Sequence, residues 1–104
     1  MRIKKFKKSE PTIGNYVICE EESDAPPVMD FIRDNIGKFI RLDEKSEETY
    51  CVIQYDNIPP DIRLPYFSYY SSNNLRPMLR SEILFWSDNK EDLEIILNSK
   101  KYNL

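Results

Sequence analysis

The pattern of hydrophobic and polar positions along the chain predicts four β-strands. They lie at residues 16–19 (YVIC), 38–42 (KFIRL), 49–55 (TYCVIQY) and 82–86 (EILFW). β-Branched and aromatic residues dominate these stretches, as is typical of half-buried strands. Residues 43–48, between the second and third stretches, are almost wholly charged and predict an exposed turn. The pattern therefore predicts a β-meander, around which the rest of the chain is organised.

A short helix is predicted between the first two strands. Proline is well tolerated at the start of a helix, and Pro26-Pro27 precedes three apolar residues with helical spacing, Val28, Ile32 and Ile36. The alternative is an irregular loop, because a helix of about two turns is not stable alone in water.

A second helix is predicted over residues 88–101. Asp88 can cap it, with Glu91 three residues later in the arrangement of a capping box. The predicted buried side of this helix carries apolar side chains at helical spacing: Leu93, Ile96, Leu97 and Tyr102.

Residues 57–80 are predicted to form a long loop, because they contain four of the seven prolines. Loops of this length in compact domains are often functional. Neighbouring side chains of an extended segment point to opposite sides, so one pair of its aromatic rings should anchor the loop and the other should face outward. The alternative is that the rings fold back into the core. The predicted partner-binding residues are Tyr66, Phe67, Tyr69, Tyr70, Arg63 and Arg76.

Length and composition predict one globular domain spanning residues 1–104. Hydrophobic residues make up 40% of the chain and charged residues 32%, which is ordinary for a folded domain. No apolar run approaches the roughly 20 residues that a membrane span needs. No apolar segment follows the basic N-terminus, which argues against a secretory signal. We therefore expect a cytoplasmic protein that does not enter membranes.

The residues that usually carry chemistry are scarce in this sequence. Histidine is absent, and neither glycine lies in a phosphate-binding loop motif. Cys19 and Cys51 lie within apolar runs and lack metal-ligand or redox spacing, so we expect buried, reduced thiols, with a disulfide or a reactive thiol as the alternatives. The acidic turn at 43–48 does not follow the pattern of a calcium loop. The sequence therefore predicts no catalytic residues, no metal site and no cofactor.

Charge is distributed unevenly, with a net value of −3. Residues 1–10 form a basic arm, which either contacts phosphate or is a solvated end. Two acidic clusters could form one negative surface if the first two strands were parallel, whereas a hairpin-like arrangement would place them at opposite ends. The candidate members of this surface are Glu20, Glu21, Glu22 and Asp24 in one cluster and Asp43, Glu44, Glu47 and Glu48 in the other.

Four stretches in this order, IGNYVIC, IGKFIRL, TYCVIQY and SEILFWS, resemble the strands of an SH3-like small barrel. The first is similar to the G-x-x-V strand of KOW- and Tudor-like modules, and the second to their G-K-I strand. The resemblance covers about half of the chain. It implies a mainly β (α+β) fold, a small antiparallel barrel or bent sheet with a short inserted helix and a C-terminal helix. It transfers no ligand site.

Two functional hypotheses follow. The first is a non-catalytic protein-interaction module that binds a protein partner through the aromatic loop. The composition also resembles that of small accessory proteins of phages and mobile elements, and a specific form of this hypothesis is an inhibitor of a host nuclease or defence enzyme. The second is a small nucleic-acid-associated barrel, in which tyrosines stack on bases and cations contact phosphates. Its expected cations are Lys4, Lys5, Lys7, Lys8, Arg63, Arg76 and Arg80. Partner identity and oligomeric state stay open.

Overall fold

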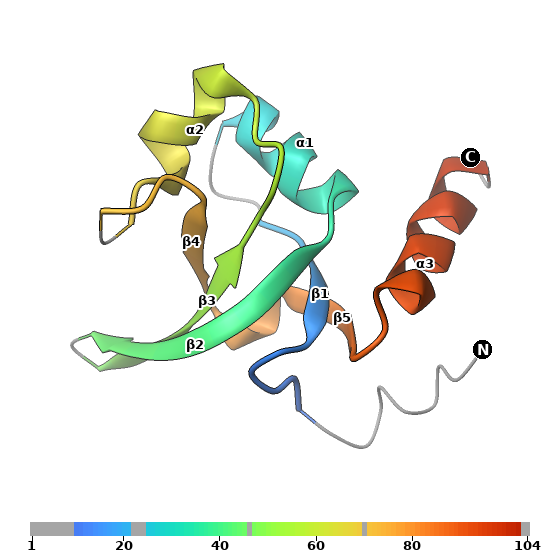
Figure 1. Cartoon of the computed structure of the whole chain (residues 1–104), viewed down its shortest axis with the longest axis horizontal. Coiled ribbons are helices and arrows are strands. Elements are labelled where there is room, and N and C mark those ends of the chain that lie inside the picture. The colour runs from blue at the N-terminus through green and yellow to red at the C-terminus, as the bar shows by residue number, and fades with distance from the viewer. Residues whose placement is uncertain (1–9, 22–24, 46, 70, 103–104) are drawn as a thin grey trace.

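A computed structural model of the chain describes residues 10–21, 25–45, 47–69 and 71–102, without the side chains of residues 101 and 102. Within these residues the fold is α+β, with a five-stranded antiparallel sheet in the order β4-β3-β2-β1-β5 and three α-helices (Figure 1). The strands are β1 (Tyr16–Cys19), β2 (Gly37–Lys45), β3 (Glu48–Gln54), β4 (Leu75–Met78) and β5 (Ile83–Ser87). The helices are α1 (Pro26–Asp34), α2 (Pro60–Phe67) and α3 (Lys90–Tyr102), and a short 3-10 turn, η2 (Arg80–Glu82), precedes β5.

The predicted α+β class is confirmed, and the sheet ends at β4 on one side and at β5 on the other. The four predicted strands correspond to β1, β2, β3 and β5. β2 and β3 continue into the predicted turn, and their pairing reaches Lys45 and Glu48. This extension is possible because the hairpin carries its charged side chains in solvent, where Glu44, Glu47 and Glu48 are exposed.

The prediction of a loop over residues 57–80 is wrong, because this range contains α2 and β4. Pro60 lies in the first turn of α2, where its missing N–H costs no helical hydrogen bond. Burial of Ile62 and Phe67 then stabilises a helix that also contains Pro65. β4 is an edge strand, and an edge position tolerates Pro77.

Helix α1 forms as predicted and ends before Ile36. Its first residues are Pro26 and Pro27, and its apolar side buries Val28 and Ile32 completely. Figure 1 shows α1 and α2 close together, with α3 on a different side of the sheet beside β1 and β5. None of the helices in the described ranges is long and apolar enough to span a membrane.

Helix α3 packs through the residues that the sequence predicted. Leu93 is fully buried against Ile18, and Ile96 and Leu97 are partly buried beside it. The prediction of Asp88 as its cap is wrong, because the Asn89 side chain accepts the Glu91 backbone N–H at 3.0 Å. The side chain of Tyr102 lies outside the described residues.

The larger core cluster lies between the sheet and the pair α1 and α2. Three rings meet there edge to face, those of Phe31, Tyr55 and Phe67, with centroids 5.6–5.8 Å apart. Such aromatic contacts stabilise a core beyond the area that they bury. Cys19 and Cys51 are free and buried in the same cluster, which confirms the predicted placement of both thiols.

Candidate functional site

The described aromatic residues that were predicted to bind a partner instead contact other residues of the chain. Phe67 is fully buried in the core, and Tyr66 is partly buried against it. The Tyr69 hydroxyl donates a hydrogen bond to the Asp43 carboxylate, and the Lys45 ammonium lies 4.9 Å from the centroid of the same ring. Tyr70 lies outside the described residues. The described rings therefore hold α2, β4 and the β2–β3 hairpin together instead of gathering on an outward face.

Arg76 and Glu21 were predicted at the surface, and both predictions need correction. The Arg76 guanidinium donates to both carboxylate oxygens of Glu21, at 2.8 and 2.7 Å, and to the Tyr66 carbonyl at 2.7 Å. Only 13% of the Arg76 side chain and 5% of the Glu21 side chain is exposed. A bidentate pair with this burial holds β4 against the segment after β1. Arg63, by contrast, is exposed on α2.

The described members of the two acidic clusters do not form one surface. β1 and β2 are antiparallel, with Tyr16 opposite Lys38 and Val17 opposite Gly37. Glu20, after the end of β1, therefore lies toward the start of β2. The second cluster lies at the far end of β2 and in the hairpin: Asp43, Glu44, Glu47 and Glu48. Glu22, Asp24 and the basic arm before Glu10 lie outside the described residues.

The structure has an apolar groove that the sequence did not predict. Its volume is about 420 Å³, within the range of pockets that hold small ligands or side chains. We call it the apolar groove, and define it by its lining residues: Glu10, Pro11, Thr12, Ile13, Phe39, Leu42, Thr49, Cys51 and Arg80.

One wall of the apolar groove is a tight turn. The Asn15 backbone N–H donates to the Thr12 carbonyl at 3.0 Å, and Gly14 adopts a positive φ of 102° between them. Glycine at this position suits a type II turn, in which Ile13 occupies the tip. The Asn15 side chain fixes the turn by accepting the Thr12 N–H at 2.8 Å and donating to Asp88 at 2.7 Å. The turn therefore holds Ile13 outward, 59% exposed.

The floor of the apolar groove is the β2–β3 hairpin. The pairing of β2 with β3 shifts between Phe39 and Arg41, so that Ile40 is an extra residue in the manner of a β-bulge. Because of this shift Phe39 and Leu42 both line the groove, although strict alternation would place them on opposite faces. Leu42 is 54% exposed, whereas Phe39 and Cys51 are buried.

The polar rim of the apolar groove contains one ion pair. The Arg80 guanidinium donates to the Glu10 carboxylate, and its central carbon lies 4.6 Å from the centroid of the Trp86 ring. Arg80 also donates to the Ile83 carbonyl at 3.3 Å. The Arg80 guanidinium is therefore already bound by other groups of the chain. Between Arg80 and Leu42, the groove is mainly apolar.

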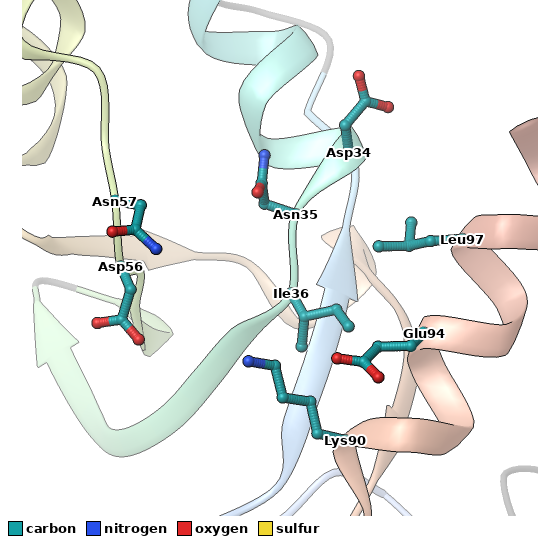
Figure 2. Close-up of a pocket in the computed structure, with 8 residues that line it drawn as sticks. All are labelled: Asp34, Asn35, Ile36, Asp56, Asn57, Lys90, Glu94 and Leu97. Carbon is teal, nitrogen blue, oxygen red and sulfur yellow. The ribbon is translucent and has the colours of Figure 1, made fainter.

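A second pocket, of about 260 Å³, lies between α3 and the start of β2 (Figure 2). Lys90, Glu94 and Leu97 project into it from α3, and Asp56 and Asn57 lie on its other side. Its charged side chains are exposed, and no set of side chains in the described ranges has the arrangement of a metal site. A solvated, charged pocket of this kind offers little apolar area to a ligand.

The buried thiols are unsuited to nucleophilic chemistry. Burial raises the pKa of the Cys19 thiol to about 12, and burial also raises the pKa of Cys51, which lines the apolar groove. Because the thiolate is the reactive form, neither cysteine is activated near neutral pH. Cys51 therefore contributes an unreactive, apolar surface to the groove, which suits the binding of an apolar group.

Comparison with protein-family models, with curated proteins and with solved structures finds no match for the chain. The geometry of the apolar groove is thus the main guide to function. In the sequence, Ile13 lies just before the strand predicted at residues 16–19 and Leu42 ends the strand predicted at 38–42, and neither was a candidate binding residue. The turn sequence TIGN carried a usable signal, since glycine in the third position places an isoleucine at a turn tip. The β-bulge at Ile40 had no comparable signal.

Proposed function

We propose that the chain is a non-catalytic protein-interaction module that receives an apolar side chain of a partner protein in the apolar groove. One observation carries the proposal: Ile13 and Leu42 are 59% and 54% exposed, and both line a groove whose base is the buried core. Full burial of a large aliphatic side chain stabilises by roughly 1.5–3 kcal/mol. A partner that covers these two side chains would therefore gain affinity without reorganising the core.

Further features support this proposal. The chain has no histidine, and its Cys19 thiol stays protonated near neutral pH, which disfavours general-base and nucleophilic catalysis. An SH3-like bent sheet also belongs to the proposal. It is supported by the return of β5 to pair with β1 and by the long, curved course of β2 (Figure 1).

The charge of the chain bears on two further hypotheses, an inhibitor of a nucleic-acid enzyme and a nucleic-acid-binding protein. The chain carries eighteen acidic and fifteen basic side chains, and this net charge of −3 suits an inhibitor that covers the nucleic-acid site of an enzyme, which is a specific form of the proposal. The nucleic-acid hypothesis is less well supported, because Arg76 and Arg80 are paired with Glu21 and Glu10.

A displayed library of short random peptides, selected on the immobilised full chain, tests the groove as a binding site. The Leu42→Ser variant should bind the selected peptides several-fold more weakly, because Leu42 is 54% exposed and covering this exposed part contributes on the order of 1 kcal/mol. Leu64→Ser is the matched control, since Leu64 is 65% exposed on α2 and does not line the groove. Its affinity should match that of the unaltered chain.

Two results would contradict the proposal. One is a selection whose peptides bind Leu42→Ser and the unaltered chain equally well, or that yields no binding peptide. The other is binding of single-stranded DNA that weakens steeply with salt and leaves the groove variants unaffected, which would favour the nucleic-acid hypothesis.

A further inference from the structure

The β2–β3 hairpin places one acidic side chain beside the apolar groove. Leu42 pairs with Cys51 and Glu44 pairs with Thr49, and directly paired residues share a face of an antiparallel hairpin. Because Leu42, Thr49 and Cys51 line the groove, Glu44 lies on the groove face of the hairpin, two pairs beyond Leu42 along the ladder. Asp43 and Lys45 occupy the opposite face, where Tyr69 contacts both.

The charge of Glu44 is uncompensated in the described part of the chain. Glu44 is exposed, and neither a hydrogen bond nor an ion pair joins it to another described residue. The cation of the groove rim, Arg80, already pairs with Glu10 and stacks on Trp86. The mouth of the groove therefore presents an apolar floor with an available carboxylate at its hairpin end.

We propose that the partner segment is basic: it carries a lysine or arginine close to its apolar anchor, and Glu44 binds this cation. This inference rests on the proposed function of the apolar groove. The net charge of −3 acts in the same direction, because a negative field raises the association rate of a basic segment. Glu44 thus contributes selectivity, while Ile13 and Leu42 contribute the apolar contact.

The test uses the peptides recovered from the displayed library on the full chain. Peptides that bind more weakly to Leu42→Ser should be enriched in lysine or arginine next to a large apolar residue. Glu44→Gln should weaken the best such peptide about threefold, because an exposed ion pair is a modest interaction. Glu48→Gln is the matched control, since Glu48 pairs with Lys45 on the opposite face of the same hairpin. It should change the affinity less than Glu44→Gln does.

A charge-reversed version of the same peptide, with glutamates in place of its basic residues, should bind at least about tenfold more weakly at low salt. Leu42-dependent peptides without basic residues would overturn this inference while the proposed function stands. The same holds if Glu44→Gln and Glu48→Gln have equal effects. Loss of the dependence on Leu42 would instead overturn the proposed function, and this inference with it.

Discussion

At the scale of single residues, the most consequential polar contact is the ion pair between Glu21 and Arg76. Its two hydrogen bonds satisfy a carboxylate that is almost fully removed from water. Loss of one partner of a buried pair leaves the other charge uncompensated, which typically costs about 3–5 kcal/mol. The sequence could not distinguish Glu21 from its neighbours, because three adjacent glutamates offer the same side chain and only the fold selects one.

Replacement of Glu21 by glutamine should therefore lower the free energy of unfolding by about 3–5 kcal/mol. Urea denaturation followed by circular dichroism measures this value. The matched control is Glu20→Gln, which removes the same charge from the exposed neighbouring position and should change stability by less than about 0.5 kcal/mol. Equal effects of the two substitutions would show that the ion pair with Arg76 contributes nothing specific.

Buried neutral groups make the chain sensitive to alkaline pH. Burial raises the pKa of Cys19 from its ordinary value of 9.0 to about 12, and it raises the pKa of Tyr55 well above 10.0. Both groups are neutral when protonated. Their contribution to stability is therefore complete at pH values below the pKa that each group has in the unfolded chain. It is lost as the pH rises toward the higher pKa that each group has in the folded chain.

We expect the free energy of unfolding to fall as the pH rises above about 9, by up to about 1.4 kcal/mol per pH unit for each group that titrates only when unfolded. Cys19→Ala should give a shallower decline between about pH 9 and pH 12, because the unfolded chain then has one fewer acidic group. An identical slope for both proteins would contradict the burial of a protonated Cys19.

At the scale of elements, the strands and terminal helices were predictable and the segment 57–80 was not. Local patterns located β1, β2, β3, β5, α1 and α3 because each has the apolar spacing of its type. α2 contains Pro60 and Pro65, whose low helix propensity predicted a loop. Burial of Ile62 and Phe67 outweighs that propensity, and such a tertiary effect is invisible in the local sequence.

Close packing at the start of β2 gives a testable consequence at this scale. A Cβ at Gly37 would lie 2.4 Å from the Ile53 Cγ2 atom and 2.9 Å from a carbon of the Tyr55 ring. Gly37→Ala should therefore lower the free energy of unfolding by about 1–3 kcal/mol, as overpacked cores do. Gly37 belongs to the IGKFIRL stretch that resembles a G-K-I strand, but the local sequence does not indicate how closely Ile53 and Tyr55 pack against it.

Thermal or urea unfolding of a double-mutant cycle checks the origin of this loss. Ile53→Ala removes the nearer of the contacting side chains, so adding Gly37→Ala to that variant should cost less than adding it to the unaltered chain. Equal costs in both backgrounds would indicate that the Gly37 position is not limited by its contact with Ile53.

At the scale of the whole molecule, the apolar groove joins segments that are distant in the sequence. Its wall comes from residues 10–13, its floor from β2 and β3, and its rim from Arg80. No local pattern could predict this, because the groove depends on the strand order and on the bulge at Ile40. The aromatic cluster of residues 66–70 was conspicuous in the sequence, yet its described rings contact the chain itself.

The central claim is that a partner binds in the apolar groove, and backbone amide chemical shifts of the isotopically labelled full chain test it most directly. Titration with a peptide selected on the chain should move the amide signals of Ile13, Leu42, Thr49 and Cys51. The signals of Leu64 in α2 and of Ser68 at its end, which do not line the groove, should stay fixed. Leu42→Ser should reduce the size of these changes at the same, subsaturating peptide concentration. Shifts confined to residues 60–69, or shifts of equal size in Leu42→Ser and the unaltered chain, would contradict the claim.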